Sequence, residues 1–539
     1  GAPLFGERRA GVETSFVDPL LVGEVQVVRG PSSTFQGAGA LGGVVEVFPR
    51  RRAGWSAEAG WASQGSERSA AVGWGGGGWS LAAAWRDAGD AETADGERLF
   101  SRSSRLTASA ERSWTAAAAD WSLVVWPSAV RDVGKPNVDV SRRTTLYPAE
   151  DHLVASLTAL FRGGWHGNAW LHPHAVDTRT TEADGARALV ENDAFDGGVR
   201  VEREARLSAA LALRAGGEAV ARRAVDAVET AFDPAGRRLA AARPLDGAAQ
   251  DELSAFASLA WALRGATLAA GGRWTHLGQD NRAAGAAGLD DAAWNGFAGA
   301  VVPLGGGLRA TGNLGTGMRW PTLSERFFTG TTGRGAVVAN PGLGPERSLQ
   351  GDLGLAWSGR RAHLAAHVFQ SEIEGFIEQV ELPAREPGES TSTFVNLGEG
   401  TLRGVEVEGV AELAPGWTLS AGGHAIDGEN EAGGALSDVP ADRLSANLAA
   451  GPAARLAGGR LTVRLRVERR AAIDDPGPGE RAIPGATLVS AGLGWQLGPG
   501  FVLTLSGGNL TDRRWLPAAD DKAMPAAGRS VGVSLRWER

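Results

Sequence analysis

Two pairs of histidines are the residues whose type and spacing most directly suggest metal chemistry. His172 and His174 flank a single proline, and His363 and His367 lie four positions apart. Imidazole nitrogen is a common ligand of zinc and other transition metals. However, residues two or four apart on a strand share a face by periodicity alone. The spacing therefore does not by itself indicate a metal site, and we predict none.

A second group combines aromatic rings with a cationic side chain. Phe327, Phe328 and Arg334 lie in one short stretch of the sequence. An anionic, planar chelate could contact such rings and pair with the guanidinium group. Packing of a loop against its surroundings would explain the same residues equally well. We treat these three residues as candidates for ligand binding.

The sequence contains no comparable group of residues for catalysis. A hydrolase would need Ser, His and a carboxylate that converge in space. No spacing in the sequence nominates such a set. We therefore predict no catalytic residues, no enzymatic activity and no cofactor.

From Trp55 onward, residues of alternating character show the period of two that is typical of β-strands, the elements that would position these residues. Trp55 and Trp61 lie on one face of their segment, and Trp79 and Trp85 repeat the arrangement. Six residues of strand span roughly 20 Å. That length approaches the apolar band of an outer-membrane barrel, which is about 25 Å tall and has an aromatic girdle at each edge. The alternative is a soluble sandwich with tryptophan in its core.

Charged residues occupy the second face of later segments without interrupting the first. Apolar residues at 461, 463, 465 and 467 alternate with polar or charged residues at 462, 464, 466 and 468. Short connections are expected at 75–78, 112–113 and 162–167, and long polar ones at 87–100, 127–148 and 177–195. Short periplasmic turns and long external loops are typical of such barrels. Dividing roughly 485 residues by about 22 per strand and connection predicts on the order of 22 strands.

Composition is consistent with this architecture. The 539 residues include 78 Gly and 19 Trp but no Cys, and 43% are hydrophobic. No uninterrupted apolar stretch reaches the roughly 18 residues of a membrane-spanning helix. The net charge of −8 argues against nucleic acid as a partner. The Ala-rich stretch 207–224 could form a helix by propensity alone.

The residues before Trp55 have a different character. Short apolar strands are expected at 25–28 and 44–48, and a glycine-rich run at 37–43 lies between them. Glycines at this density permit positive φ angles and close backbone approach, which suits a compact domain inside a larger one. A nucleotide-binding loop is disfavoured because no Gly-Lys-Ser/Thr follows.

Four blocks of the sequence, in the expected order, resemble the TonB-dependent outer-membrane receptors. The first, at 16–45, resembles the closing half of their plug domain; the others are Met318-Arg-Trp-Pro-Thr-Leu-Ser-Glu-Arg-Phe-Phe328 with the Asn-Pro-Gly-Leu motif at 340–343, the stretch 394–408, and Asn509-Leu-Thr-Asp512. The plug motif consists of Arg29, Gly30, Pro31, Gly37, Gly39, Gly42 and Gly43.

The resemblance implies an all-β fold, a transmembrane antiparallel β-barrel of about 22 strands with a partial plug domain in its lumen. Residues 1–50 would be the C-terminal part of the plug and 51–539 the barrel. We expect Arg29 to pair with acidic groups of the plug or the wall. The energy-coupling box and the first half of the plug do not precede Gly1, so we expect a sequence truncated at its N-terminus.

The resemblance also implies a location and a function. The location is the outer membrane of a Gram-negative bacterium, with outer-membrane lipid and a TonB-type energising protein as partners. The function is active, TonB-energised uptake of a scarce nutrient, with a ferric siderophore as the leading ligand. Cobalamin or another metal chelate is the alternative ligand, and a passive porin is the alternative function if the plug is incomplete. Receptors for heme in this family often carry a histidine in the region between Pro321 and Asn340; none lies there, which disfavours heme.

Overall fold

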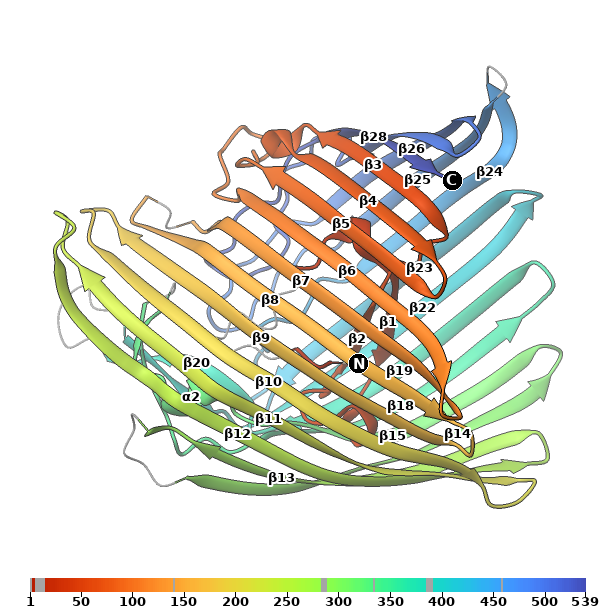
Figure 1. The fold of residues 1–539 in the computed structure, drawn as a ribbon, viewed down its shortest axis with the longest axis horizontal. Helices are drawn as coiled ribbons and strands as arrows, with labels where there is room; N and C mark the ends of the chain where they lie inside the picture. The colour runs from red at the N-terminus through yellow and green to blue at the C-terminus, as the bar shows by residue number, and fades with distance from the viewer. Residues whose placement is uncertain are drawn as a thin grey trace.

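A closed β-barrel dominates the computed structural model, which describes residues 2–4, 15–138, 141–282, 288–332, 335–383, 391–456 and 459–539. Within these residues, 22 antiparallel strands form the barrel, and the last strand pairs with the first (Figure 1). The predicted all-β barrel of about 22 strands is therefore confirmed. In the same residues, no helix is long and apolar enough to cross a membrane.

The strands of the barrel follow one another along the chain, with each strand hydrogen-bonded to the next. They are β3 (Gly54–Ala62), β4 (Arg68–Gly76), β5 (Trp79–Ala88), β6 (Ser103–Ala116), β7 (Ala119–Lys135), β8 (Arg143–Phe161), β9 (Trp165–Glu182), β10 (Arg187–Arg206), β11 (Leu211–Phe232), β12 (Arg238–Leu263), β13 (Ala266–Asp280), β14 (Leu289–Gly305), β15 (Leu308–Arg319), β18 (Glu346–Ser358), β19 (Ala362–Glu374), β22 (Glu399–Ala414), β23 (Trp417–Asn430), β24 (Arg443–Leu456), β25 (Gly459–Arg470), β26 (Ala486–Gly498), β27 (Phe501–Gly508) and β28 (Ser530–Glu538). A short 3₁₀ turn, η2 (Gln64–Ser66), joins β3 to β4.

The outer surface of the barrel carries the alternating apolar residues. Trp55, Trp61, Trp79 and Trp85 are all between 41% and 59% exposed, as expected for side chains that face lipid. Trp55 lies opposite Trp74 near one end of the strands, and Trp61 lies opposite Arg68 near the other. The prediction of outward-facing tryptophans at two heights is confirmed.

Several predicted loops are instead continuations of strands. β7 extends to Lys135 and β8 begins at Arg143, so most of 127–148 is strand. β9 and β10 likewise take up most of 177–195. β12 has 26 residues, whereas about 9–11 suffice to cross the membrane. Beyond the lipid band both faces of a strand are free to be polar, so the alternation that identifies a strand is lost there.

One further sequence prediction differs from the structure, and one alternative left open by the sequence is excluded. The turn expected at 112–113 lies at 117–118, between β6 and β7. The Ala-rich stretch 207–224 is not helical, because most of it belongs to β11. There the ladders to β10 and β12 satisfy the backbone hydrogen bonds and override the helix propensity of alanine.

A smaller unit formed by residues before β3 lies inside the barrel, and we call it the lumenal unit (Figure 1). It consists of η1 (Pro19–Leu21), β1 (Val22–Arg29), α1 (Ser33–Gln36) and β2 (Gly43–Pro49). β1 and β2 form an antiparallel two-stranded sheet in which Val27 pairs with Val45. This unit contacts β5, β6, β15 and β22, which lie on different sides of the barrel. Only a segment in the lumen can reach all of them.

A second small sheet belongs to the segments 320–345 and 375–398, which connect β15 to β18 and β19 to β22. Its strands are β16 (Gly330–Thr332), β17 (Gly335–Val338), β20 (Ile377–Glu381) and β21 (Thr391–Asn396), in the order β16-β17-β21-β20. The short helix α2 (Leu323–Phe327) precedes it. These segments pack on each other around Val337, Leu343, Ile377 and Phe394.

Candidate functional site in the barrel lumen

The glycines of the plug motif allow the chain to turn sharply between β1 and β2. Gly43 pairs with Arg29 and has a φ angle of +145°, and a Cβ atom there would lie 2.4 Å from the carbonyl oxygen of Val28. Any other residue would therefore push the two strands apart. The amide of Gly30 donates to the carbonyl of Gly42 at 3.1 Å, which closes the loop.

Arg29 reaches from this unit to the wall of the barrel. Its guanidinium group lies 2.5 Å from Glu406 and 3.8 Å from Glu408, both on β22. The expected pairing of Arg29 with acidic groups is therefore present. Its side chain remains 60% exposed, so the pair contributes only about 0–1 kcal/mol to holding the unit in place.

The opposite side of the unit is held by buried groups. Asp18 is completely buried, accepts a hydrogen bond from the Leu20 amide at 2.9 Å and pairs with Arg86 of β5 at 3.0 Å. The carbonyl of Phe16 accepts hydrogen bonds from Thr107 and Ser128 at 3.0 and 2.8 Å. Nearby, a small apolar cluster packs η1 against the wall through Leu21, Ala71, Ala82, Ala84 and Trp126.

A third contact joins the turn between β1 and β2 to β15. The amide of Met318 donates to the Ser33 hydroxyl at 3.1 Å, and the amide of Gly39 donates to the Met318 carbonyl at 2.8 Å. Gly37 lies beside Arg273, which a Cβ atom would approach to 3.4 Å. The two sequence blocks that resemble the family, one in the plug motif and one at the end of β15, thus meet in the folded chain.

The segment after β15 is fixed by a buried ion-pair network. Arg319 binds Glu346 through two parallel hydrogen bonds of 2.7 and 2.8 Å and also binds Glu325 at 2.9 Å. Glu325 further completes a capping box with Thr322, which starts α2. Arg326 reaches Asp291 of β14 at 2.8 Å. These contacts fold the segment back onto the barrel.

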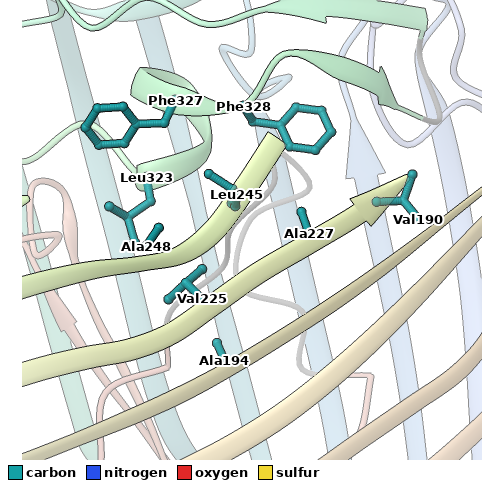
Figure 2. Close-up of a cluster of buried hydrophobic side chains, with 9 residues drawn as sticks. All are labelled: Val190, Ala194, Val225, Ala227, Leu245, Ala248, Leu323, Phe327 and Phe328. Carbon is teal, nitrogen blue, oxygen red and sulfur yellow. The ribbon is translucent and has the colours of Figure 1, made fainter. Parts of the chain in front are cut away.

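Phe327 and Phe328, two of the candidate ligand-binding residues, lie in a buried apolar cluster. They are 5% and 3% exposed and pack with seven residues of α2 and the barrel wall (Figure 2), which are Val190, Ala194, Val225, Ala227, Leu245, Ala248 and Leu323. A ligand would reach these rings only if α2 moved away from β10, β11 and β12. Arg334, the third candidate, lies outside the described residues. The ligand role of the three residues stays a prediction.

The histidines at 172 and 174 lie in a larger group than the sequence indicated. Register places His152 of β8 opposite His174, and Asp196 of β10 opposite His172. His152 also contacts Glu150 at 3.0 Å. The proximity of His152, Glu150 and Asp196 could not be predicted from the sequence because it depends on strand register. His363, from the other pair, contacts the Ser358 hydroxyl at 3.0 Å.

Comparison with known proteins identifies the same architecture. The family model described as TonB dependent receptor-like, beta-barrel, matches residues 173–510, which is more than half of the chain. No curated protein matches the sequence.

Solved structures share the fold at low sequence identity. The copper transporter OprC has a TM-score of 0.83 and 15% identity, over 98% of this chain and 88% of that one. The FrpB iron transporter from Neisseria meningitidis has a TM-score of 0.74 and 15% identity, over 97% and 88%. The ferric yersiniabactin uptake receptor FyuA from Yersinia pestis has a TM-score of 0.73 and 17% identity, over 96% and 85%. With the family match, the chain belongs to the TonB-dependent receptors, which are transporters of the Gram-negative outer membrane rather than enzymes.

Proposed function

We propose that this protein takes up a chelated metal across the outer membrane in a TonB-energised process, with a ferric siderophore as the leading substrate and cobalamin or another metal chelate as the alternative. In this proposal residues 1–50 form the C-terminal part of the plug, and 51–539 form the barrel. The observation that carries the proposal is the unit anchored inside the lumen. A wide barrel needs such an obstruction, and transport requires that it can be displaced.

The contacts of the lumenal unit suit displacement. Most of them are hydrogen bonds and ion pairs, such as Arg29 with Glu406 and Met318 with Ser33. Water can replace polar contacts of this kind at small net cost, since a protein hydrogen bond contributes about 0.5–1.5 kcal/mol. The apolar contacts are few: Leu21 packs on one side of the lumen, and the ring of Phe35 lies 5.2 Å from that of Phe297 on the other. A force applied to the unit would therefore release it stepwise.

The sheet of β1 and β2 also supports a larger plug. Val25, Val27 and Val45 are 53%, 61% and 64% exposed although they lie inside the barrel. Apolar side chains of a plug are normally covered, since each fully buried valine contributes about 1.5–3 kcal/mol. We propose that further plug residues cover this sheet.

The names of the similar structures guide the choice of substrates to test. They include an iron transporter, a ferric yersiniabactin receptor, a copper transporter and a hemophore receptor. Identities of 14–17% carry the fold but not the substrate. The covered rings of Phe327 and Phe328 give no direct support to any one ligand.

The test is uptake by cells that express the complete gene, compared with cells that lack it. Ferric siderophores, cobalamin, copper and heme are supplied separately, with the proton gradient intact and then collapsed. We expect uptake of a chelated metal that stops when the gradient is collapsed. Uptake that ignores the gradient would favour a passive porin. Uptake of heme alone would contradict the argument from the absent histidine.

A further inference from the structure

Three histidine rings form a stack on the inner wall of the barrel. The ring centroids of His172 and His174 are 4.6 Å apart, and those of His152 and His172 are 5.2 Å apart. His172 is 1% exposed, and the side chains of His152 and His174 are 7% and 10% exposed. Two carboxylates, Glu150 and Asp196, are buried beside the rings. Imidazoles and carboxylates buried together are the donor set of a transition-metal site.

The hydrogen bonds of the stack assign its tautomers. Glu150 accepts from the Ser15 hydroxyl at 2.8 Å and contacts Nε2 of His152 at 3.0 Å, so this carboxylate makes Nε2 of His152 the protonated nitrogen. Nδ1 of the neutral His152 ring is then an acceptor. It lies 2.9 Å from Nε2 of His172, which must be the donor.

This assignment determines the state of the other nitrogen of His172, Nδ1. With its proton on Nε2, the ring carries a lone pair on Nδ1. That atom is buried and has no hydrogen-bond partner among the described residues. A buried polar atom without a partner is rare in native proteins and requires an explanation. A metal ion bound to Nδ1 would supply one, and the carboxylate-histidine relay behind it would orient the ring as metal sites usually require.

Two more donors lie beside the ring of His172. His174, His172 and Asp196 each offer a ligand atom, and all three atoms lie within 4.8 Å of one another. Nε2 of His174 and Oδ2 of Asp196 are 3.2 Å apart. With metal bonds of roughly 2.0–2.1 Å, two ligands of one tetrahedral ion lie about 3.3 Å apart. Arg222 donates to Oδ1 of Asp196 at 2.9 Å and so leaves Oδ2 directed at His174.

We propose that His172, His174 and Asp196 bind a divalent transition-metal ion of the Cu²⁺, Ni²⁺ or Zn²⁺ class, and that His152 and Glu150 are positioning residues for His172. This proposal goes beyond the uptake proposed above, because the site needs no chelator and its occupancy is measured without transport. A second group of three potential ligands, His166, Glu202 and Glu204, does not qualify. There Arg200 and Arg214 donate to both carboxylate oxygens of Glu202, whereas Arg222 donates to only one oxygen of Asp196.

The lumenal unit covers the proposed site. The ring of Phe16 stacks on His152 with centroids 4.1 Å apart, and its carbonyl is held by two hydroxyl groups of the wall. An ion in the site would therefore lie behind the same segment that blocks the lumen. Entry and exit of the ion would require movement of the chain around Phe16.

The test uses the purified full chain in detergent, with an affinity tag that contains no histidine, after treatment with a chelator. Titration with Co²⁺ alone should saturate at one equivalent and produce visible absorption bands of a site with nitrogen and oxygen ligands, and Zn²⁺ should displace the Co²⁺. X-ray absorption of the Cu²⁺-loaded protein should show two imidazole ligands. Neither measurement depends on a variant that folds.

Variants then assign the ligands. His172→Ala and His174→Ala should each weaken Co²⁺ binding by more than the roughly 10- to 100-fold typical of a positioning residue. His152→Ala should fall within that range, and His152→Gln, whose carbonyl oxygen can accept from His172, should restore part of the loss and of the spectrum. His166→Ala is the matched control and should bind normally. All variants are checked for the heat-dependent electrophoretic shift of a folded barrel.

Two results would overturn the proposal. One is wild-type protein that binds no Co²⁺ below millimolar concentration or whose Cu²⁺ spectrum lacks imidazole. The other is folded His172→Ala protein that binds as the wild type does. Failure of the uptake experiment would leave both measurements unaffected, so the two proposals fail separately.

Discussion

Arg319 joins two buried carboxylates that belong to different elements, Glu325 of α2 and Glu346 at the start of β18. Glu325 and Glu346 are 8% and 4% exposed, and Arg319 itself is 27% exposed. Two parallel hydrogen bonds to Glu346 use the planar fork of the guanidinium group, which lysine cannot reproduce. The identity of this single residue therefore controls how α2 is held against the start of β18.

Replacing Arg319 tests this role. Arg319→Met should leave two buried carboxylates without their cation, a change that costs about 3–5 kcal/mol. Because the strand ladder does not depend on Arg319, the barrel should stay folded while 320–345 becomes susceptible to protease and to hydrogen exchange. Arg319→Lys should give an intermediate result. The control is Arg98→Met, since Arg98 is 75% exposed in its pair with Asp90. Equal protection of the segment in Arg319→Met and wild type would contradict this prediction.

Strands, as elements, are predictable from this sequence only where one face meets lipid. Between Trp79 and Trp85 the outward residues are apolar and the inward ones small, so period two is visible. In β7 and β8 the same backbone continues into water, where polar residues occupy both faces. Because the sequence predicts a loop at 127–148, it does not indicate that Glu150 and His152, which follow this stretch, lie on a strand. Their partners on β9 and β10 are set by register across strands, which no short-range pattern reports.

The helix α2 is held on the barrel by its apolar side chains. Replacing Phe327 and Phe328 together by Ala removes two rings from the cluster in Figure 2, and each such change costs about 3–5 kcal/mol in a packed core. We expect faster hydrogen exchange in 320–345 with normal barrel assembly. Phe327→Leu should cost less, and Leu239→Ala, at a site 61% exposed, should have no effect.

The same double variant tests the ligand role of these rings. If they contact ligand after α2 moves, binding of the transported chelate should weaken in the double variant and in Arg334→Ala alike. Normal ligand binding in the double variant would assign the rings to packing of α2 alone.

At the scale of the whole molecule, the barrel brings together residues that are hundreds of positions apart. Ser33 and Met318 are an example, since they are 285 residues apart and share a hydrogen bond of 3.1 Å. Both residues lie in sequence blocks that resemble the family, at 16–45 and 318–328. Only the structure of the closed barrel shows that the two blocks are in contact. The contact joins the lumenal unit to the wall at the opposite side from Asp18. It is therefore a suitable point at which to prevent the unit from moving.

A disulfide between these two positions should stop transport reversibly. These 539 residues contain no cysteine, so Ser33→Cys with Met318→Cys introduces two thiols that can pair with each other. A disulfide requires Cα atoms roughly 4.4–6.8 Å apart, which the hydrogen bond between these residues favours. In cells that express the complete gene, we expect oxidation to abolish gradient-dependent uptake and reduction to restore it. Each single variant should transport under both conditions.

The outcome separates two ways in which the lumen could open. If the lumenal unit leaves the wall as one body, a single covalent link at β15 blocks every later step. If only the side near Phe16 and Asp18 is released, the cross-linked protein still transports, and the link merely tethers a part that never moves. Full uptake by the oxidised double variant, with the cross-link verified by peptide mapping, would therefore contradict the first route. It would also direct attention to the Phe16 side, where the proposed metal site lies.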